Sequence, residues 1–232
     1  MQHRSMKPLA LFAATALCWG TSQAALITQS GTDVDFTYDD ATLFGMGTVV
    51  GNSIFFTPTT FKAESLNDDG AVSPIGQNTL NIQVDVTSGG GYEITNFQLA
   101  ELGDYLLTGN SSSVSASARL QVSSNTTTCG FFNCVDTKID NVSGLTTVGT
   151  TTEWTAAVGI DLADTADWGS DSSVIAQIQN NLLATSTVNG ESAMIQKKAA
   201  GVGLVINPIP VPAAVWLFGS ALGLLGWMRR KT

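Results

Sequence analysis

The sequence has almost no histidine, since His3 is the only one among its 232 residues. A chain without an imidazole after residue 3 excludes Ser-His-Asp and Cys-His catalysis, and every metal site with a histidine ligand, for this chain acting alone. Cysteine is nearly as scarce, with three residues in all. Any catalytic chemistry would therefore have to rest on carboxylates.

Basic residues are also few, with ten lysines and arginines against nineteen acidic residues. Arg4, Lys7 and residues 229–231 lie near the two ends, so the segment 25–207 holds five basic and all nineteen acidic residues, a net charge of −14. Such a charge repels phosphate backbones and anionic lipid. We therefore expect no nucleic-acid partner, whereas cations and neutral polymers remain compatible with it.

The N-terminus has the pattern of a secretory signal peptide. Arg4 and Lys7 precede an apolar run from Leu9 to Trp19, and small residues follow up to Ala24. This order predicts a signal peptide over residues 1–24, cut by signal peptidase between Ala24 and Ala25. Export to an oxidising compartment in turn predicts a disulfide between the closely spaced Cys129 and Cys134, closing a small loop.

The C-terminus predicts a transmembrane helix. Residues 211–228 carry no charge, and eighteen helical residues reach about 27 Å, just short of a hydrocarbon core of about 30 Å. Trp216 and Trp227 lie near the ends of this span, and the basic residues after it favour a cytoplasmic end. Composition alone is typical of an ordinary single-pass membrane anchor.

A proline motif precedes that span and an arginine pair follows it, and together they resemble a PEP-CTERM sorting signal of the VPxPA variant. The matching residues include Pro210, Val211, Pro212, Ala213, Arg229 and Arg230. The resemblance implies a Gram-negative, usually exopolysaccharide-producing cell and an exosortase-type membrane protease that removes the tail. It also implies an inner-membrane intermediate with the domain in the periplasm, and then a cell-surface or extracellular location.

The middle of the chain alternates apolar and polar residues, which predicts strands. In the segment LNIQVDVT, for example, Leu80, Ile82, Val84 and Val86 share one face. The expected strands are Asp33–Tyr38, Thr48–Phe56, Thr79–Thr87, Tyr92–Leu102, Ser113–Ser123, Trp154–Asp161, Ala193–Lys197 and Val202–Ile206. For Ser172–Leu183 the pattern fits a helix or a strand, and we favour the strand. Asn189-Gly190 predicts a hairpin that joins Leu182–Val188 to Glu191–Lys197.

Eight or more short strands with turns between them predict an all-β fold, a two-layer antiparallel β-sandwich with Greek-key or jelly-roll connections. We expect three parts: the signal peptide 1–24, the exported sandwich 25–207 and the sorting signal 208–232.

Two acidic clusters are candidate sites. Four aspartates surround Trp168 in an expected loop: Asp161, Asp164, Asp167 and Asp171. Their oxygens suit Ca²⁺, but the EF-hand pattern is missing, and we favour a solvated acidic loop over a metal site. The other cluster is Asp33, Asp35, Asp39 and Asp40. We expect no cofactor, with Ca²⁺ as the alternative.

We therefore expect a non-enzymatic surface or matrix protein with a structural or adhesive role, acting alongside exopolysaccharide. One alternative is a carbohydrate-binding sandwich, with or without Ca²⁺. A second is a carboxylate-dependent glycoside hydrolase, with Glu153 beside Trp154 or Glu93 beside Tyr92 as the acid.

Overall fold

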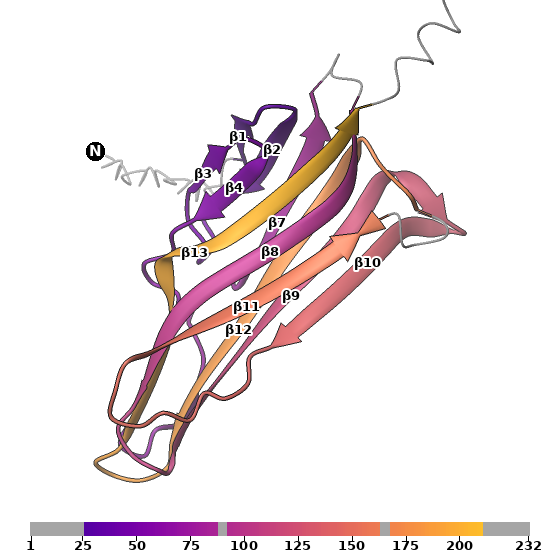
Figure 1. Ribbon diagram of the computed structural model, residues 1–232. Coiled ribbons are helices and arrows are strands. Elements are labelled where there is room, and N and C mark those ends of the chain that lie inside the picture. The colour runs from indigo at the N-terminus through magenta and orange to yellow at the C-terminus, as the bar shows by residue number, and fades with distance from the viewer. Residues whose placement is uncertain (1–25, 88–91, 163–167, 211–232) are drawn as a thin grey trace, which may run out of the picture.

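A computed structural model describes residues 26–87, 92–162 and 168–210, and these form an all-β domain without an α-helix in those ranges (Figure 1). The thirteen strands in the described ranges are β1 (Leu26–Ser30), β2 (Val34–Asp39), β3 (Gly47–Val50), β4 (Ser53–Phe56), β5 (Lys62–Leu66), β6 (Gly70–Val72), β7 (Thr79–Val86), β8 (Tyr92–Leu107), β9 (Ser112–Cys129), β10 (Phe132–Asn141), β11 (Thr152–Asp161), β12 (Ser173–Ser186) and β13 (Ser192–Pro210).

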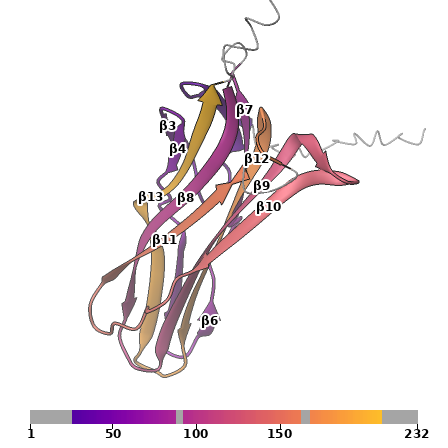
Figure 2. The ribbon, with the colours of Figure 1, turned by 45° about the vertical axis from the view of Figure 1, so that its right-hand side comes forward.

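The strands form two antiparallel sheets. Sheet A has the order β1-β2-β7-β12-β9-β10, with β6 also paired to β12, and sheet B has the order β11-β8-β13-β4-β3, with β5 also paired to β13. From β10 to β13 the chain changes sheet at every connection. The two sheets lie face to face, and their long strands run the length of the molecule (Figures 1 and 2). This arrangement is consistent with the predicted β-sandwich.

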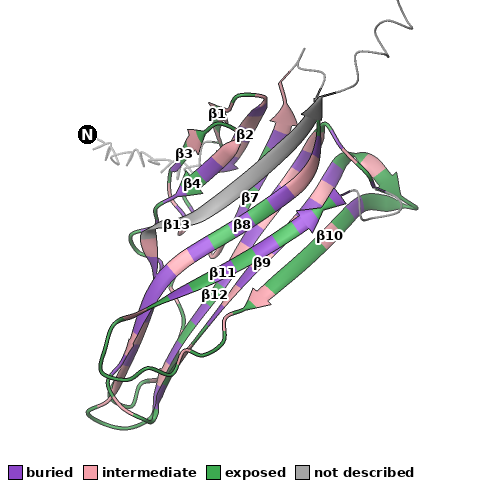
Figure 3. Cartoon of the chain, in the orientation of Figure 1, coloured by how far each residue is buried: buried purple, intermediate pink, exposed green. Residues whose placement is uncertain are grey.

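Alternation decides which side chains face the core between the sheets. Along β7, Leu80, Ile82 and Val84 are fully buried while their neighbours point outward. The same alternation along β8 and β11 is visible as successive buried and exposed residues in Figure 3. One continuous hydrophobic cluster joins the inward residues of both sheets. Burial of these rows is what holds each strand in its register.

Several expected strands are confirmed and others need correction. The ambiguous stretch Ser172–Leu183 is a strand from Ser173 onward, within β12. The single strand expected over Thr48–Phe56 was wrong: Gly51, with a φ of 61°, turns the chain between β3 and β4. The two strands expected over residues 193–197 and 202–206 belong to one strand, β13. Its pairing with β8 shifts register between Lys197 and Val202 and again between Ile206 and Pro208.

The predicted hairpin at Asn189-Gly190 was wrong. The chain does turn there, and the Glu191 N–H donates to the Val188 carbonyl at 3.2 Å. However, β12 pairs with β7 and β9 in sheet A, whereas β13 pairs with β8, β4 and β5 in sheet B. A tight turn fixes only a local reversal of the chain. Both flanking strands are central strands whose pairing edges are filled by other strands, so the turn crosses between sheets.

Strand β13 continues to Pro210, three residues past the boundary expected at 207. Within the described ranges no helix is long and apolar enough to cross a membrane. The expected signal peptide, transmembrane helix and sorting residues Val211, Pro212, Ala213, Arg229 and Arg230 lie outside the described residues.

Candidate functional site

A hairpin tip closed by a disulfide is the first candidate site. Strands β9 and β10 are joined through Gly130 and Phe131, and the Cys129–Cys134 bond closes the tip with a Cα–Cα distance of 4.8 Å. This confirms the predicted cysteine pair. The tip leans away from the body of the sandwich (Figures 1 and 2). The disulfide holds the turn in one shape and links it to Cys134, which is buried in the hydrophobic cluster.

The tip presents apolar side chains to solvent. Phe131 is 101% exposed and Phe132 is 80% exposed, although these rings are the kind of side chain that normally supplies a core. Val135 and Ile139, further along the edge strand β10, are also more than half exposed. These exposed apolar residues make the tip a candidate surface for contact with a partner.

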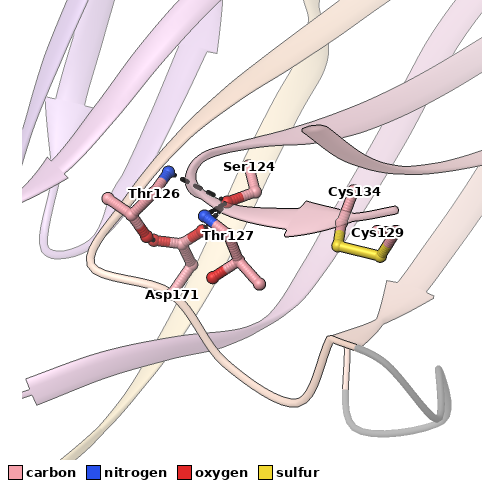
Figure 4. The surroundings of a disulfide bond; sticks show 6 residues. All are labelled: Ser124, Thr126, Thr127, Cys129, Cys134 and Asp171. Atoms are coloured by element: carbon pink, nitrogen blue, oxygen red, sulfur yellow. Dashed lines mark hydrogen bonds between the residues drawn. A yellow bond between two sulfur atoms is a disulfide. The ribbon is translucent and has the colours of Figure 1, made fainter. Parts of the chain in front are cut away.

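The base of the tip is fixed by Asp171 (Figure 4). Its carboxylate accepts hydrogen bonds from the Ser124 hydroxyl, from the Thr126 hydroxyl at 2.5 Å and from the Ser173 N–H at 3.0 Å. Ser124 in turn accepts the N–H groups of Thr126 and Thr127 at 3.0 and 2.6 Å. These bonds hold together a bulge in β9, where four residues of β9 lie opposite the single residue Cys134 of β10.

Asp171, one of the four candidate calcium ligands, is already occupied by these hydrogen bonds. Asp171 is buried and both of its oxygens are engaged by protein donors. Asp161 lies at the end of β11, and Asp164 and Asp167 lie outside the described residues. Among the residues that the structure describes, no three or more histidine, cysteine, aspartate or glutamate side chains form a group that could hold a metal ion. A calcium site in this loop remains a prediction.

The second candidate site is a buried polar cluster in the core, which the sequence analysis missed. Lys197 on β13 and Glu101 on β8 form an ion pair whose two side chains have no exposed surface. Asn180, on β12 of the opposite sheet, donates from Nδ2 to both carboxylate oxygens of Glu101, at 2.5 Å to Oε2. Lys197 donates to the same Oε2. Three strands from two sheets therefore meet at one carboxyl group.

Aromatic rings enclose the Lys197 ammonium group. Its Nζ lies 5.1 Å from the centre of the Trp154 ring and 5.5 Å from that of Phe61. Trp154 and Lys197 pair with Gly103 from either side of β8. A Cβ at Gly103 would lie 2.5 Å from the Trp154 ring, so the absence of a side chain there lets the indole cross the strand toward Lys197.

Burial changes the protonation of both charged groups. Loss of hydration raises the pKa of Glu101, although the Lys197 charge and its hydrogen bond oppose this change. Loss of hydration likewise lowers the pKa of Lys197 against the effect of Glu101. The environment therefore favours the neutral amine and the neutral acid more than water does.

The strand pattern did contain a signal for this cluster. Glu101 continues the inward row of Phe97 and Leu99, and Lys197 continues the row of Ala193 and Ile195. Asn180 stands in the inward row of β12 between two buried residues, Ile178 and Leu182. A polar residue in phase with a buried row is the signal that could have found each of them.

The remaining candidate acids lie apart from both sites. Asp33 lies just before β2 and exchanges hydrogen bonds with Asn52, whereas Asp35 lies within β2, so the two do not share a strand as expected. Asp39 accepts the N–H of Ala41 at its own turn.

The two glutamates considered for hydrolysis have separate partners. The Ser170 hydroxyl donates to Glu93 at 2.6 Å, while Glu153 pairs with Lys198 at 2.7 Å, which lowers the pKa of Glu153. Trp154, the aromatic neighbour of Glu153, is buried in the core. Trp154 therefore does not present its ring to a sugar bound at Glu153.

Comparison of the chain with protein-family models, curated proteins and solved structures finds no match.

Proposed function

We propose that this chain is an exported, non-enzymatic cell-surface or extracellular-matrix protein with a structural or adhesive role, and that the disulfide-closed tip is its contact element. The observation that carries the proposal is the pair of exposed rings, Phe131 and Phe132, on a turn held by the Cys129–Cys134 bond. A rigid apolar tip loses little conformational freedom when it binds, which favours adhesion. Disulfides form and persist mainly in oxidising compartments outside the cytoplasm, which agrees with export.

The proposal includes the route to the surface. A signal peptide over residues 1–24 directs export, and a Greek-key or jelly-roll sandwich follows it. The apolar span 211–228 is held as a helix in the inner membrane until an exosortase-type protease removes the tail. What supports this route is the resemblance of the tail to a sorting signal, together with the disulfide.

Polysaccharide is the partner that the tip favours. Flat aromatic rings pack on the C–H faces of sugars, and this contact needs no charge, which suits a domain with a net charge of −14 facing a neutral polymer. A carbohydrate-binding module is accordingly the second candidate. It differs from a purely structural role in requiring saturable binding to a defined glycan.

Retention of the purified protein on dextran and cellulose tests the adhesive tip. We expect the double variant Phe131→Ser/Phe132→Ser to lose at least about tenfold in retention, because two large apolar contacts disappear. Phe55→Ser is the matched control, since Phe55 is 40% exposed on β4, away from the tip. Equal retention of wild-type and tip variant on every polymer that binds would overturn the tip as the contact element. Adding Ca²⁺ in a parallel series tests the calcium alternative.

Mass spectrometry of the mature C-terminus from the native host tests the route separately. A chain that ends within residues 208–213 supports processing. An intact Thr232 in purified membranes would instead make the tail a permanent anchor.

A further inference from the structure

A primary amine, a primary amide and a carboxyl group meet in the centre of the sandwich. Lys197 Nζ and Asn180 Nδ2 donate to the same Glu101 oxygen, so the two nitrogens are separated by at most two hydrogen-bond lengths, about 6 Å. Lys197 and Glu101 have no exposed side-chain surface, and Asn180 is 1% exposed. Buried ion pairs contribute little to stability compared with apolar residues of similar volume. Stability alone therefore does not explain why these three polar groups are buried together, and a chemical role is the alternative.

We propose that Lys197 and Asn180 react to form an intramolecular isopeptide bond, with Glu101 carrying the protons. The reaction joins the Nζ atom of the lysine to the Cγ atom of the asparagine and releases ammonia.

The bond changes and proton transfers balance without any further reagent. The lone pair of the neutral Lys197 amine attacks Asn180 Cγ, and the electrons of the C=O double bond move to Oδ1. Glu101 as the acid gives its proton to the departing Nδ2, the C–Nδ2 bond breaks and the carbonyl reforms. The attacking nitrogen returns a proton to the Glu101 carboxylate. A secondary amide and ammonia result, with Glu101 again protonated and nothing oxidised or reduced.

The surroundings suit each requirement of this reaction. An amine attacks only when it is unprotonated, and burial favours the neutral forms of both Lys197 and Glu101. The rings of Trp154 and Phe61 beside Nζ exclude water that would compete for the amide carbon. Holding the amine and the amide at one carboxyl group, on strands of the two facing sheets, replaces an encounter in solution by a fixed placement.

The carbonyl oxygen of the amide is also available. Asn180 Oδ1 is buried and has no hydrogen-bond partner among the described residues, so no donor there holds the amide in its ground state. The backbone of the same residue is fixed, because its N–H donates to the Asn78 carbonyl at 3.1 Å and its carbonyl accepts from the Asn78 side chain at 2.9 Å. The backbone that carries the reacting carbon is thus held in place.

The product would join the two sheets covalently. Asn180 belongs to β12 in sheet A and Lys197 to β13 in sheet B, and the crossing turn near Asn189-Gly190 lies between them in the chain. Since the disulfide closes only the hairpin tip, this bond would be the covalent tie through the core. It goes beyond the proposed adhesive function and does not depend on it.

Peptide mapping of the purified full-length protein tests the proposal. Cleavage after glutamate separates Asn180, in the fragment 154–191, from Lys197, in the fragment that starts at Ser192. We expect one branched peptide whose mass is about 17 Da below the sum of the two fragments, owing to the lost ammonia. Two linear peptides of unchanged mass from the folded wild-type protein would overturn the proposal. So would a branch from Lys197 to the Glu101 peptide, with loss of about 18 Da.

Two variants test the assigned roles. Glu101→Gln should yield only linear peptides, because the glutamine side chain at position 101 cannot donate and take back a proton as a carboxyl group does. A branched peptide in this variant would refute the role of Glu101. Lys198→Met changes the neighbouring, partly exposed lysine and should leave the branch intact. The wild-type digest decides between bond and no bond even where the Glu101 variant fails to fold.

Discussion

Replacing Gly103 by alanine provides the sharpest test of how the core cluster is built. An added Cβ would lie 2.2 Å from the Gln196 carbonyl oxygen and 2.5 Å from two atoms of the Trp154 ring. Carbon atoms pack at about 3.5 Å, so the neighbours must move by about 1 Å. One of them is backbone of the adjacent strand β13, which cannot change rotamer to make room.

The expected cost follows from that geometry. Overpacking a core costs about 1–3 kcal/mol, and a clash with backbone in the middle of a sheet belongs near 3 kcal/mol. For a domain of this size that corresponds to a fall in melting temperature of about 6–12 °C. The assay is thermal unfolding of the full-length protein and variant, followed by far-UV circular dichroism.

Gly159→Ala is the matched control in the adjacent strand β11. Its Cβ would meet nothing closer than 4.0 Å and would point outward, so its melting temperature should stay within about 2 °C of wild type or rise slightly. If the Gly103→Ala protein is as stable as the Gly159→Ala protein, then the Trp154 ring does not need the space that Gly103 leaves over β8.

Three further predictions concern charged residues. Lys197→Met should cost about 3–5 kcal/mol in unfolding free energy, because it leaves Glu101 buried without its partner, whereas Lys198→Met should leave the denaturant midpoint near wild type. Because burial raises the pKa of Glu101 above its ordinary 4.5, its contribution to stability is complete below pH 4.5 and declines as the pH rises through the folded-state pKa. The difference in melting temperature between wild type and Glu101→Gln, measured from pH 4 upward, should shrink accordingly, and a pH-independent difference contradicts this. Asp171→Ala leaves the Ser124 hydroxyl without its acceptor, and a local cost of about 1–3 kcal/mol should appear as faster amide exchange in the bulge of β9.

Much of the fold could be predicted from alternation alone. The rows of β7 and β12 are regular enough to identify strands and their buried faces, because a strand with one face in the core must repeat every two residues. The cysteine pair was predictable from its short spacing and the expected compartment. These are local properties, and a local pattern in the sequence is sufficient to show them.

Strand pairing was not predictable in the same way. The Asn189-Gly190 turn indicates a reversal, but whether the reversed strand joins the same sheet depends on which edges other strands already fill. The cluster of Glu101, Lys197 and Asn180 depends on that same pairing. Each residue can be placed on an inward face from its own strand, yet the strands lie far apart in sequence and only the sheet order brings them together.

The position of β13 has a mechanical consequence. A pull applied through Pro210 along the strand loads the hydrogen bonds to β8 in shear, so that many must break together, and β4 and β5 hold the other side of the strand. The two register shifts divide this pairing into segments, with Pro208–Pro210 outermost and the segment ending at Lys197 innermost. Extraction would therefore stall in steps, and the last step would have to rupture the contacts around the buried lysine.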